Sequence, residues 1–165
     1  MRLFVAVRPD AAVSKALLGV MHEMKKNGVQ GSYVPAQNLH MTLAFIGETD
    51  RTADVKKALS QVAVPEVRLA LTESGMFGDL LYAGVKGNQK LKGLVRDIRA
   101  ALDREGISYD RQPFTPHITM IRKVKGRTSS IRLPKAEMTA ASFSLMKSEQ
   151  KDGRTVYREI CSFPG

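Results

Sequence analysis

The sequence predicts an α+β fold in which the sheet is mainly antiparallel. Apolar spacing indicates elements in the order strand, helix, strand, helix, strand, strand, helix, strand, strand, strand. Two strand pairs are joined by hairpin-type turns, around Gly75–Asp79 and at Asp152-Gly153. No Pro/Gly/Ser-rich linker divides the chain, and its 43% apolar and 25% charged content is typical of globular proteins. We therefore expect one domain over residues 1–165.

The first strand and helix are marked by a change of apolar period. Residues 2–8 form an apolar, β-branched run that stops at Pro9, which indicates a buried strand. After Asp10, a candidate N-cap, apolar residues recur at helical spacing until Gly28 ends the helix. His22 falls on the opposite, polar face of this helix, so we expect it to be a surface residue.

The central part alternates between the two periods. A strand is predicted over residues 39–48 and an amphipathic helix over 52–63. Residues 67–77 and 80–86 read as paired strands. The next helix, over 88–106, has the clearest apolar stripe in the chain: Leu91, Leu94, Val95, Ile98, Ala101 and Leu102.

Three strands are predicted in the C-terminal third, over residues 115–124, 137–149 and 154–163. The strands 39–48 and 115–124 each follow a long amphipathic helix and a short approach that contains Gly or Pro. This repetition predicts that the two halves of the chain are related by a pseudo-twofold axis.

The formal net charge of +10 is the strongest compositional indication of function. Such an excess raises the local concentration of polyanions and favours partners that carry phosphate. Charge alone does not distinguish RNA, DNA and an anionic membrane surface, and it also serves solubility.

Cysteine content and the N-terminal residues indicate the cellular compartment. Cys161 is the only cysteine, so it forms no internal disulfide, and the composition suits a reducing cytosol. The apolar run at the start is shorter than a secretory core or a membrane span. We expect a cytoplasmic protein without membrane segments.

A tripeptide of histidine, one apolar residue and threonine occurs twice, at His40–Thr42 and at His117–Thr119. Side chains alternate in a strand, so each histidine shares a face with its threonine while the residue between them points to the core. Imidazole exchanges protons near neutral pH, so two imidazoles supply a general acid and a general base. The threonine hydroxyls suit the non-bridging oxygens of a phosphoryl group. The pair fits hydrolysis or transfer at a phosphodiester, and a cyclic diester above all.

Two alternatives compete with this interpretation. A single His-x-Thr in a strand is commonly structural or a surface feature, and the duplication is what argues against that. Two histidines also ligate zinc, but neither motif has a nearby Asp, Glu or Cys at ligand spacing, and catalytic zinc usually has three protein ligands. We therefore expect neither a metal nor a cofactor.

The segments "MRLFVAV", "VPAQNLHMTLAFIGE" and "FTPHITMIRK" resemble the two-histidine (2H) phosphoesterase superfamily. Within it, the chain is similar to the RNA 2',3'-cyclic phosphodiesterases, also called 2'-5' RNA ligases (LigT/ThpR-like). The resemblance implies a bilobal α+β domain with two His-x-Thr strands around a central basic cleft. It also implies metal-independent opening of a terminal 2',3'-cyclic phosphate to a 2'-phosphate, with RNA ends or nucleotides as partners. We expect a monomer.

The resemblance further assigns residue roles. His40 is the implied proton donor to the 3' oxygen and His117 the proton acceptor from water, with Thr42 and Thr119 on the phosphate. Arg122 matches a phosphate-binding arginine of the family. In an ideal strand, however, Arg122 has the opposite parity to the second histidine, so a bulge or the end of the strand must re-aim it.

Aromatic residues are the remaining substrate-binding candidates. Phe45 has the same offset from the first histidine as the arginine has from the second, and is either a core residue or a platform for a base. Tyr33 lies where relatives often have tryptophan, and we expect it to contact the substrate. Phe77 and Tyr82 either stack on a nucleobase or pack in the core.

Two other functions remain compatible with the sequence. One is a non-catalytic module that binds RNA ends in the same cleft. The other is a different activity on the same site, such as ligation of RNA ends or opening of another cyclic phosphate.

Overall fold

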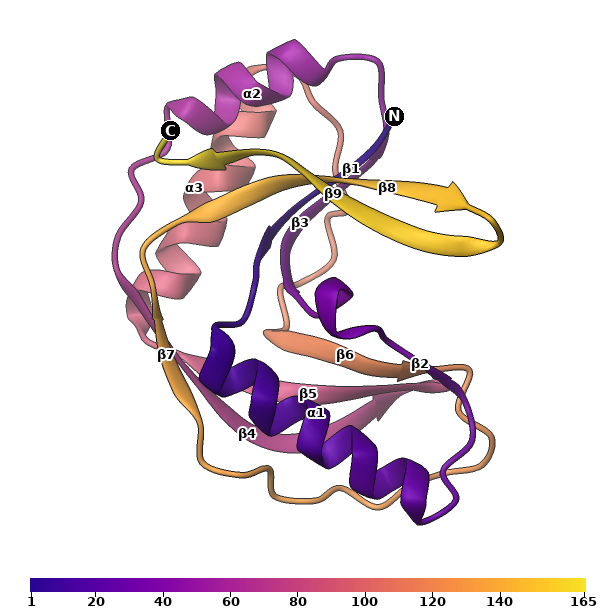
Figure 1. The fold of residues 1–165 in the computed structure, drawn as a ribbon. Coiled ribbons are helices and arrows are strands. Elements are labelled where there is room, and N and C mark those ends of the chain that lie inside the picture. The colour runs from indigo at the N-terminus through magenta and orange to yellow at the C-terminus, as the bar shows by residue number, and fades with distance from the viewer.

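Two antiparallel sheets and three helices make up the structure, a computed structural model that describes residues 1–165 (Figure 1). One sheet has the strand order β3-β1-β8-β9 and the other β2-β6-β5-β4-β7. The strands are β1 (Arg2–Val7), β2 (Ser32–Tyr33), β3 (Met41–Glu48), β4 (Val67–Phe77), β5 (Leu80–Gly87), β6 (His117–Arg122), β7 (Glu137–Ala140), β8 (Phe143–Lys151) and β9 (Arg154–Phe163). The helices are α1 (Ala11–Lys26), α2 (Thr52–Ser60) and α3 (Gln89–Arg104), with a 3₁₀ turn η1 (Ala36–Asn38). The predicted α+β class is confirmed.

The helices form because their apolar stripes meet a sheet. In α1 the buried residues are Val13, Leu17, Met21 and Met24, and the carboxylate of Asp10 caps the helix by accepting from the Val13 amide at 2.9 Å. In α3 all six residues of the predicted stripe are buried. His22 is exposed, as its position on the polar face of α1 predicted.

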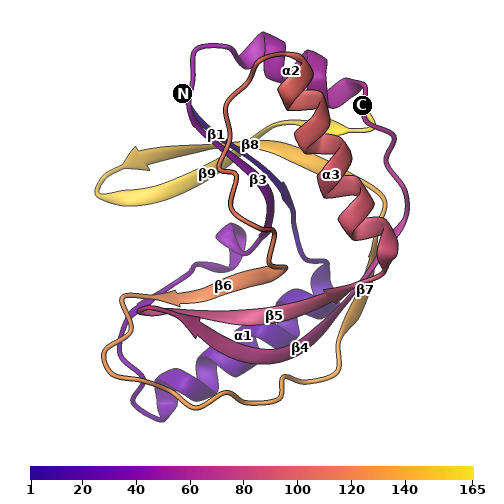
Figure 2. The same ribbon diagram turned by 180° about the vertical axis from the view of Figure 1, so that it is seen from behind.

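Each helix that precedes a His-x-Thr strand packs on the sheet that holds the other motif. Helix α1 contacts β6 and β7 of the five-stranded sheet. Helix α3 contacts β3 of the four-stranded sheet and also β4 and β5 of the five-stranded one. Figures 1 and 2 show α1 outside one sheet and α2 and α3 against the other. These crossings from each helix to the sheet of the other motif are consistent with the predicted pseudo-twofold relation.

Alternation along β1 separates the core from the space between the sheets. Leu3, Val5 and Val7 belong to the main hydrophobic cluster, which includes residues from both sheets and all three helices. Phe4 and Ala6 belong to a separate small cluster with Met146 on the opposite face. The four-stranded sheet therefore has one face on the helices and one face on the cleft described below.

The predicted strand over residues 137–149 is wrong, because this segment forms two strands in different sheets. β7 pairs with β4 in the five-stranded sheet, and β8 pairs with β1 and β9 in the other. The chain crosses between the sheets at Ala141 and Ser142, which are both exposed. These small residues interrupt neither the apolar pattern nor the strand propensity, so the crossing leaves no local signal. The short β2 and η1 were not predicted either.

Candidate active site

The two His-x-Thr motifs face each other across a cleft between the sheets. His40 immediately precedes β3 and His117 is the first residue of β6. Both histidines, Thr42 and Thr119 line one cavity of about 630 Å³. The intervening Met41 and Ile118 are buried in the core. The alternation predicted from the sequence thus places imidazole and hydroxyl groups from both sheets on a common space.

Both imidazoles are held in the same way. The Nδ1 atom of His40 lies 2.7 Å from the carbonyl oxygen of Asn38, and that of His117 lies 2.6 Å from the carbonyl oxygen of Thr115. A carbonyl oxygen only accepts hydrogen bonds, so each Nδ1 carries the hydrogen and donates it. In both motifs the acceptor is two residues before the histidine. Nε2 is therefore the atom that each histidine has available for proton exchange.

The Nε2 atom of His40 is already in contact with its own motif. It lies 3.0 Å from Thr42 Oγ1, and because Nδ1 holds the hydrogen, the threonine hydroxyl donates to a neutral Nε2. The imidazole and the hydroxyl of the first motif are thus in direct contact with each other.

Aromatic rings surround each histidine differently. The rings of Phe4 and Tyr157 lie 4.9 Å and 5.2 Å from the ring of His40, between centroids. Burial lowers the pKa of His40 below its ordinary value, and Coulomb interactions with Arg122 and His117 lower it further, although the hydrogen bond to Asn38 acts in the opposite direction. The fold therefore favours the neutral form of His40.

On the other wall, Phe77 and Tyr82 stack on each other at 4.3 Å, and their rings lie 5.2 Å and 5.5 Å from that of His117. Phe77 is 44% exposed, which argues against simple core packing. A second cavity of about 430 Å³ shares Thr42, Phe45 and His117 with the main cleft and reaches Phe77. The aromatic pair is thus placed beside His117 at the edge of the cleft.

A β-bulge aims Arg122 into the cleft, as the parity argument required. Thr119 pairs with Tyr82 and Ile121 with Leu81, so Met120 has no residue of its own opposite it on β5. Met120 and Ile121 are buried at consecutive positions, which an ideal strand does not allow. The extra residue returns Arg122 to the face of Thr119, and its side chain lines the cleft.

Phe45 lines the cleft as well, whereas Tyr33 does not. Phe45 pairs with Phe4 across β3 and β1, and the Arg2 guanidinium lies 5.0 Å from its ring centroid. Tyr33 pairs with Ile121, and directly opposed residues share a face of the sheet. Since Ile121 is fully buried in the core, Tyr33 packs there too, and its hydroxyl donates to the Val29 carbonyl at 2.7 Å. Tyr33 therefore lies outside the lining of the cleft, and its expected contact with the substrate stays a prediction.

Several cleft residues were missed by the sequence analysis. The β8–β9 hairpin presents Ser148, Gln150, Thr155 and Tyr157 to the cavity. Ser148 pairs with Tyr157 and Gln150 with Thr155, so all four share one face of the hairpin. Their alternation on both sides of Asp152-Gly153 was the available signal, but nothing local indicated that this face covers the two motifs.

Asn38 connects this hairpin to His40. It is a buried polar residue. Its side-chain amide donates to the Thr155 carbonyl at 3.1 Å, and its backbone carbonyl accepts from the His40 ring. The position of one histidine is thus coupled to the wall of the cleft.

No group of three or more His, Cys, Asp or Glu side chains is arranged to hold a metal ion. None of the helices has the length and apolar content of a membrane span.

The family model described as the 2'-5' RNA ligase superfamily matches residues 9–152. The chain belongs to this superfamily. An Escherichia coli member named RNA 2',3'-cyclic phosphodiesterase is 31% identical over 143 residues, which cover 79% of this chain and 77% of that protein. Both His-x-Thr motifs lie within the range of the family model.

Solved structures of similar proteins have the same architecture. The structure of TT0787 from Thermus thermophilus superposes with a TM-score of 0.87 at 27% identity, covering 99% of this chain and 97% of that one. The structure of E. coli LigT complexed with 3'-AMP superposes with a TM-score of 0.81 at 28% identity, covering 98% and 96%. Both alignments cover nearly the whole chain, so they include the β8–β9 hairpin that closes the cleft.

Proposed function

We propose that this protein is a metal-independent RNA 2',3'-cyclic phosphodiesterase that opens a terminal cyclic phosphate to a 2'-phosphate by two-histidine acid–base catalysis. The observation that carries the proposal is the pair of Nδ1-anchored imidazoles on opposite walls of one cleft, each next to a threonine. The names of the relatives support the same activity. The substrates are RNA ends or nucleotides that bear the cyclic phosphate.

The reaction uses the two Nε2 atoms, because each Nδ1 is held by a backbone carbonyl. Neutral His117 accepts a proton from water as the water oxygen forms a bond to phosphorus. The bond from phosphorus to O3' breaks, and Nε2–H of protonated His40 donates its proton to O3'. The products are a 2'-phosphate and a 3'-hydroxyl. Thr42, Thr119 and Arg122 bind the non-bridging oxygens, on which negative charge accumulates.

The charge of Arg122 contributes to the lowered pKa of His40. A cyclic phosphodiester carries one negative charge. When it binds between the histidines and the arginine, it offsets the arginine charge and favours the imidazolium form of His40. The general acid thus acquires its proton together with the substrate.

Incubation with 2',3'-cyclic nucleotides in EDTA tests this function directly. We expect a 2'-phosphate product at an unchanged rate after the chelator is added. No product, or product only with added metal, would overturn the mechanism, and a 3'-phosphate product would show that the wrong leaving oxygen was assigned. His40→Ala and His117→Ala are each expected to reduce kcat by about 10²–10⁴-fold.

Ligation of RNA ends is the second candidate function, and the description of the matching family favours it. In that reaction a 5'-hydroxyl takes the place of water, forms the bond to phosphorus and leaves a 2'-5' linkage. The same assay with a 5'-hydroxyl acceptor in excess distinguishes the two, because ligation gives a longer product. A non-catalytic RNA-end module would bind but release no product. We further propose that the protein acts as a monomer in the cytoplasm, which light scattering and fractionation test.

A further inference from the structure

Cations without an acidic partner follow directly after the phosphate-binding strand. The segment that begins at the end of β6 carries Arg122, Lys123, Lys125 and Arg127, all of them exposed. None of these four forms an ion pair, whereas arginines elsewhere, such as Arg51 and Arg111, are paired with carboxylates. Side chains that remain unpaired keep their charge available for a ligand.

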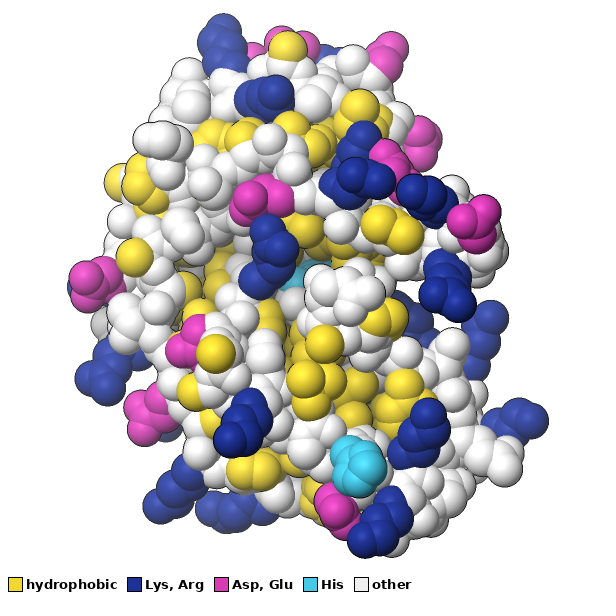
Figure 3. All heavy atoms as spheres, viewed as in Figure 1, with side chains coloured by type: hydrophobic (Ala, Val, Ile, Leu, Met, Phe, Trp, Pro, Cys, Tyr) yellow, Lys and Arg dark blue, Asp and Glu magenta, His cyan; other side chains and the backbone are white.

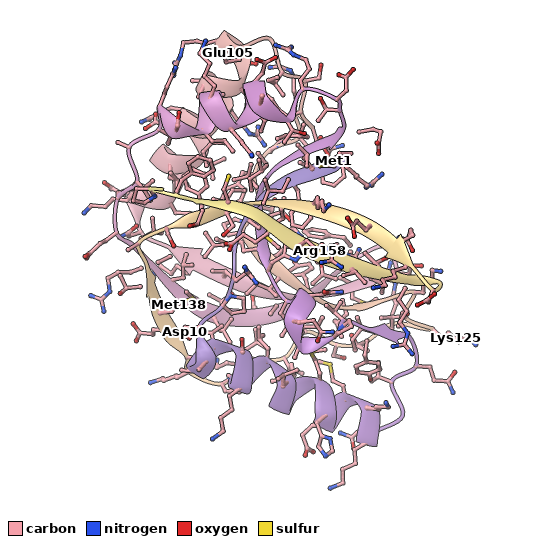
Figure 4. All side chains as sticks on the ribbon, turned by 45° about the horizontal axis from the view of Figure 1, so that its top comes forward. Met1, Asp10, Glu105, Lys125, Met138 and Arg158 are labelled. Carbon is pink, nitrogen blue, oxygen red and sulfur yellow. The ribbon has the colours of Figure 1, made fainter.

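This segment lies at the mouth of the cleft. The amide of Val124 donates to the carbonyl of Asp79 in the β4–β5 turn, and the amide of Lys125 donates to the carbonyl of Gln30. The segment is thereby fixed beside Leu80, which lines the cleft. In Figure 4, Lys125 lies on the same side of the molecule as the end of the β8–β9 hairpin. Figures 1 and 2 agree on this placement of the end of β6 and the hairpin tip.

The hairpin supplies the other side of the mouth. Its inner face presents uncharged hydroxyl and amide groups, from Ser148, Gln150 and Thr155. Its tip carries Lys151 and Arg154, which are exposed and have no acidic partner within ion-pair distance. Figure 3 shows Lys and Arg side chains gathered around this side of the molecule. Glu149 of the hairpin is already paired with Lys147 and Arg158.

We propose that the RNA chain on the 5' side of the terminal nucleotide leaves the cleft between the hairpin tip and residues 122–127, where Lys123, Lys125 and Arg127 bind its backbone phosphates. The inference rests on the proposed function. Because the cyclic phosphate ends the RNA at its 3' terminus, the chain extends from the cleft only on the 5' side of the terminal nucleotide. Lysine and arginine contacts to phosphates carry no sequence information, so the contact is independent of base sequence. The enzyme is therefore built for oligonucleotides rather than mononucleotides.

The expected size of the effect follows from counterion release. Neutralising three phosphates of a single strand gives a salt slope of about −2, since each contributes about −0.7. Raising the salt from about 50 to about 200 mM then lowers the affinity for a long substrate by about 20-fold. Removing the three charges is expected to lower kcat/KM for that substrate by about 10- to 100-fold near 0.1 M salt. A mononucleotide does not reach these residues and is unaffected.

The test compares two substrates: a 2',3'-cyclic mononucleotide, and a single-stranded oligonucleotide of about ten residues that ends in a 2',3'-cyclic phosphate. The variant is Lys123→Asn, Lys125→Gln and Arg127→Gln, in which asparagine suits the positive φ of 54° at position 123. The matched control is Lys56→Gln, Lys90→Gln and Lys92→Gln, which removes three exposed charges from α2 and α3. Thermal unfolding of both variants verifies folding.

We expect the wild type to prefer the oligonucleotide, and the variant to lose that preference and its salt dependence while it retains the mononucleotide rate within about twofold. The control should keep the preference for the oligonucleotide and its salt dependence. An equal loss of kcat/KM for the oligonucleotide in the variant and in the control would show a general charge effect and overturn the proposed path. A wild type that turns over the mononucleotide but gains nothing from chain length would do the same. Absence of mononucleotide turnover would instead contradict the proposed function itself.

Discussion

Replacing Arg122 by glutamine removes a guanidinium that shares the cleft with both histidines. The side chain is exposed, forms no ion pair and reaches the cleft only because of the bulge at Met120. Since it contributes no contact to the core, the substitution is expected to change the free energy of unfolding by less than about 0.5 kcal/mol. Its effects should therefore appear at the site rather than in the stability of the protein.

Two effects are expected. A charge-assisted hydrogen bond is worth about 1.5–3 kcal/mol, so kcat/KM for a 2',3'-cyclic mononucleotide should fall by about 10- to 150-fold. The pKa of His40 should rise toward its ordinary value, because the charge of Arg122 is one of the causes that lower it. Burial, the larger cause, remains, so the rise is partial.

Steady-state kinetics measure the first effect, and NMR titration of the His40 ring measures the second. Arg122→Lys keeps the charge but loses the planar fork, so it should leave the pKa of His40 low while restoring only part of the activity. Arg96→Gln on α3 is the control for loss of an exposed arginine. A variant at position 122 with wild-type kinetics would refute the bulge-directed phosphate contact, and an unchanged His40 titration would refute the electrostatic coupling.

Three further predictions concern stability. Asn38→Ala removes a buried amide that donates to the Thr155 carbonyl, so urea denaturation should show a loss of about 1–3 kcal/mol, and an unchanged midpoint would contradict the coupling of the hairpin to His40. The pKa of His40 is lowered in the folded state, so the unfolded chain binds more protons than the folded one as the pH falls below the ordinary histidine value of 6.5. The stabilising contribution of His40 is therefore present above that pH. It is lost as the pH falls through the lowered pKa. As the pH is lowered across this range, Tm should therefore decline more steeply for the wild type than for His40→Gln. Parallel curves of Tm against pH would contradict the lowered pKa of His40. Gly75→Ala places a Cβ against the Tyr82 ring that flanks His117, so Tm and activity should both fall. The control is Gly19→Ala on α1, which has open space around it and should raise Tm slightly. A higher Tm for Gly75→Ala than for Gly19→Ala would show that the Phe77–Tyr82 pair can move freely.

Periodicity identified most of the elements because each signal is local. The apolar stripes of α1 and α3 specify which face is buried whatever lies against it, and all six predicted stripe residues of α3 are in the core. The same reasoning paired His40 with Thr42 and His117 with Thr119 on common faces, and the lining of the cleft agrees with it. It also detected that Arg122 required an irregular strand.

Other features depend on which strand lies opposite, and the sequence does not encode that locally. The segment over residues 137–149 has a continuous strand pattern, yet β7 and β8 find their partners in different sheets. Tyr33 has no periodic context of its own, and its face was set by pairing with Ile121. The link from Asn38 to Thr155 joins residues 117 positions apart, so the hairpin wall is likewise set by distant parts of the chain.

By itself, the sequence determined the two imidazole–hydroxyl pairs, the amphipathic helices and the excess of positive charge. Each of these depends on residue type and on a period of two or 3.6 residues, which act within one element. Only the tertiary structure decided that the motifs face each other, that a bulge turns Arg122 toward them and that burial lowers the pKa of His40. These features arise from pairing between distant strands, and the energies that select such pairs come from the packing of whole sheets and helices.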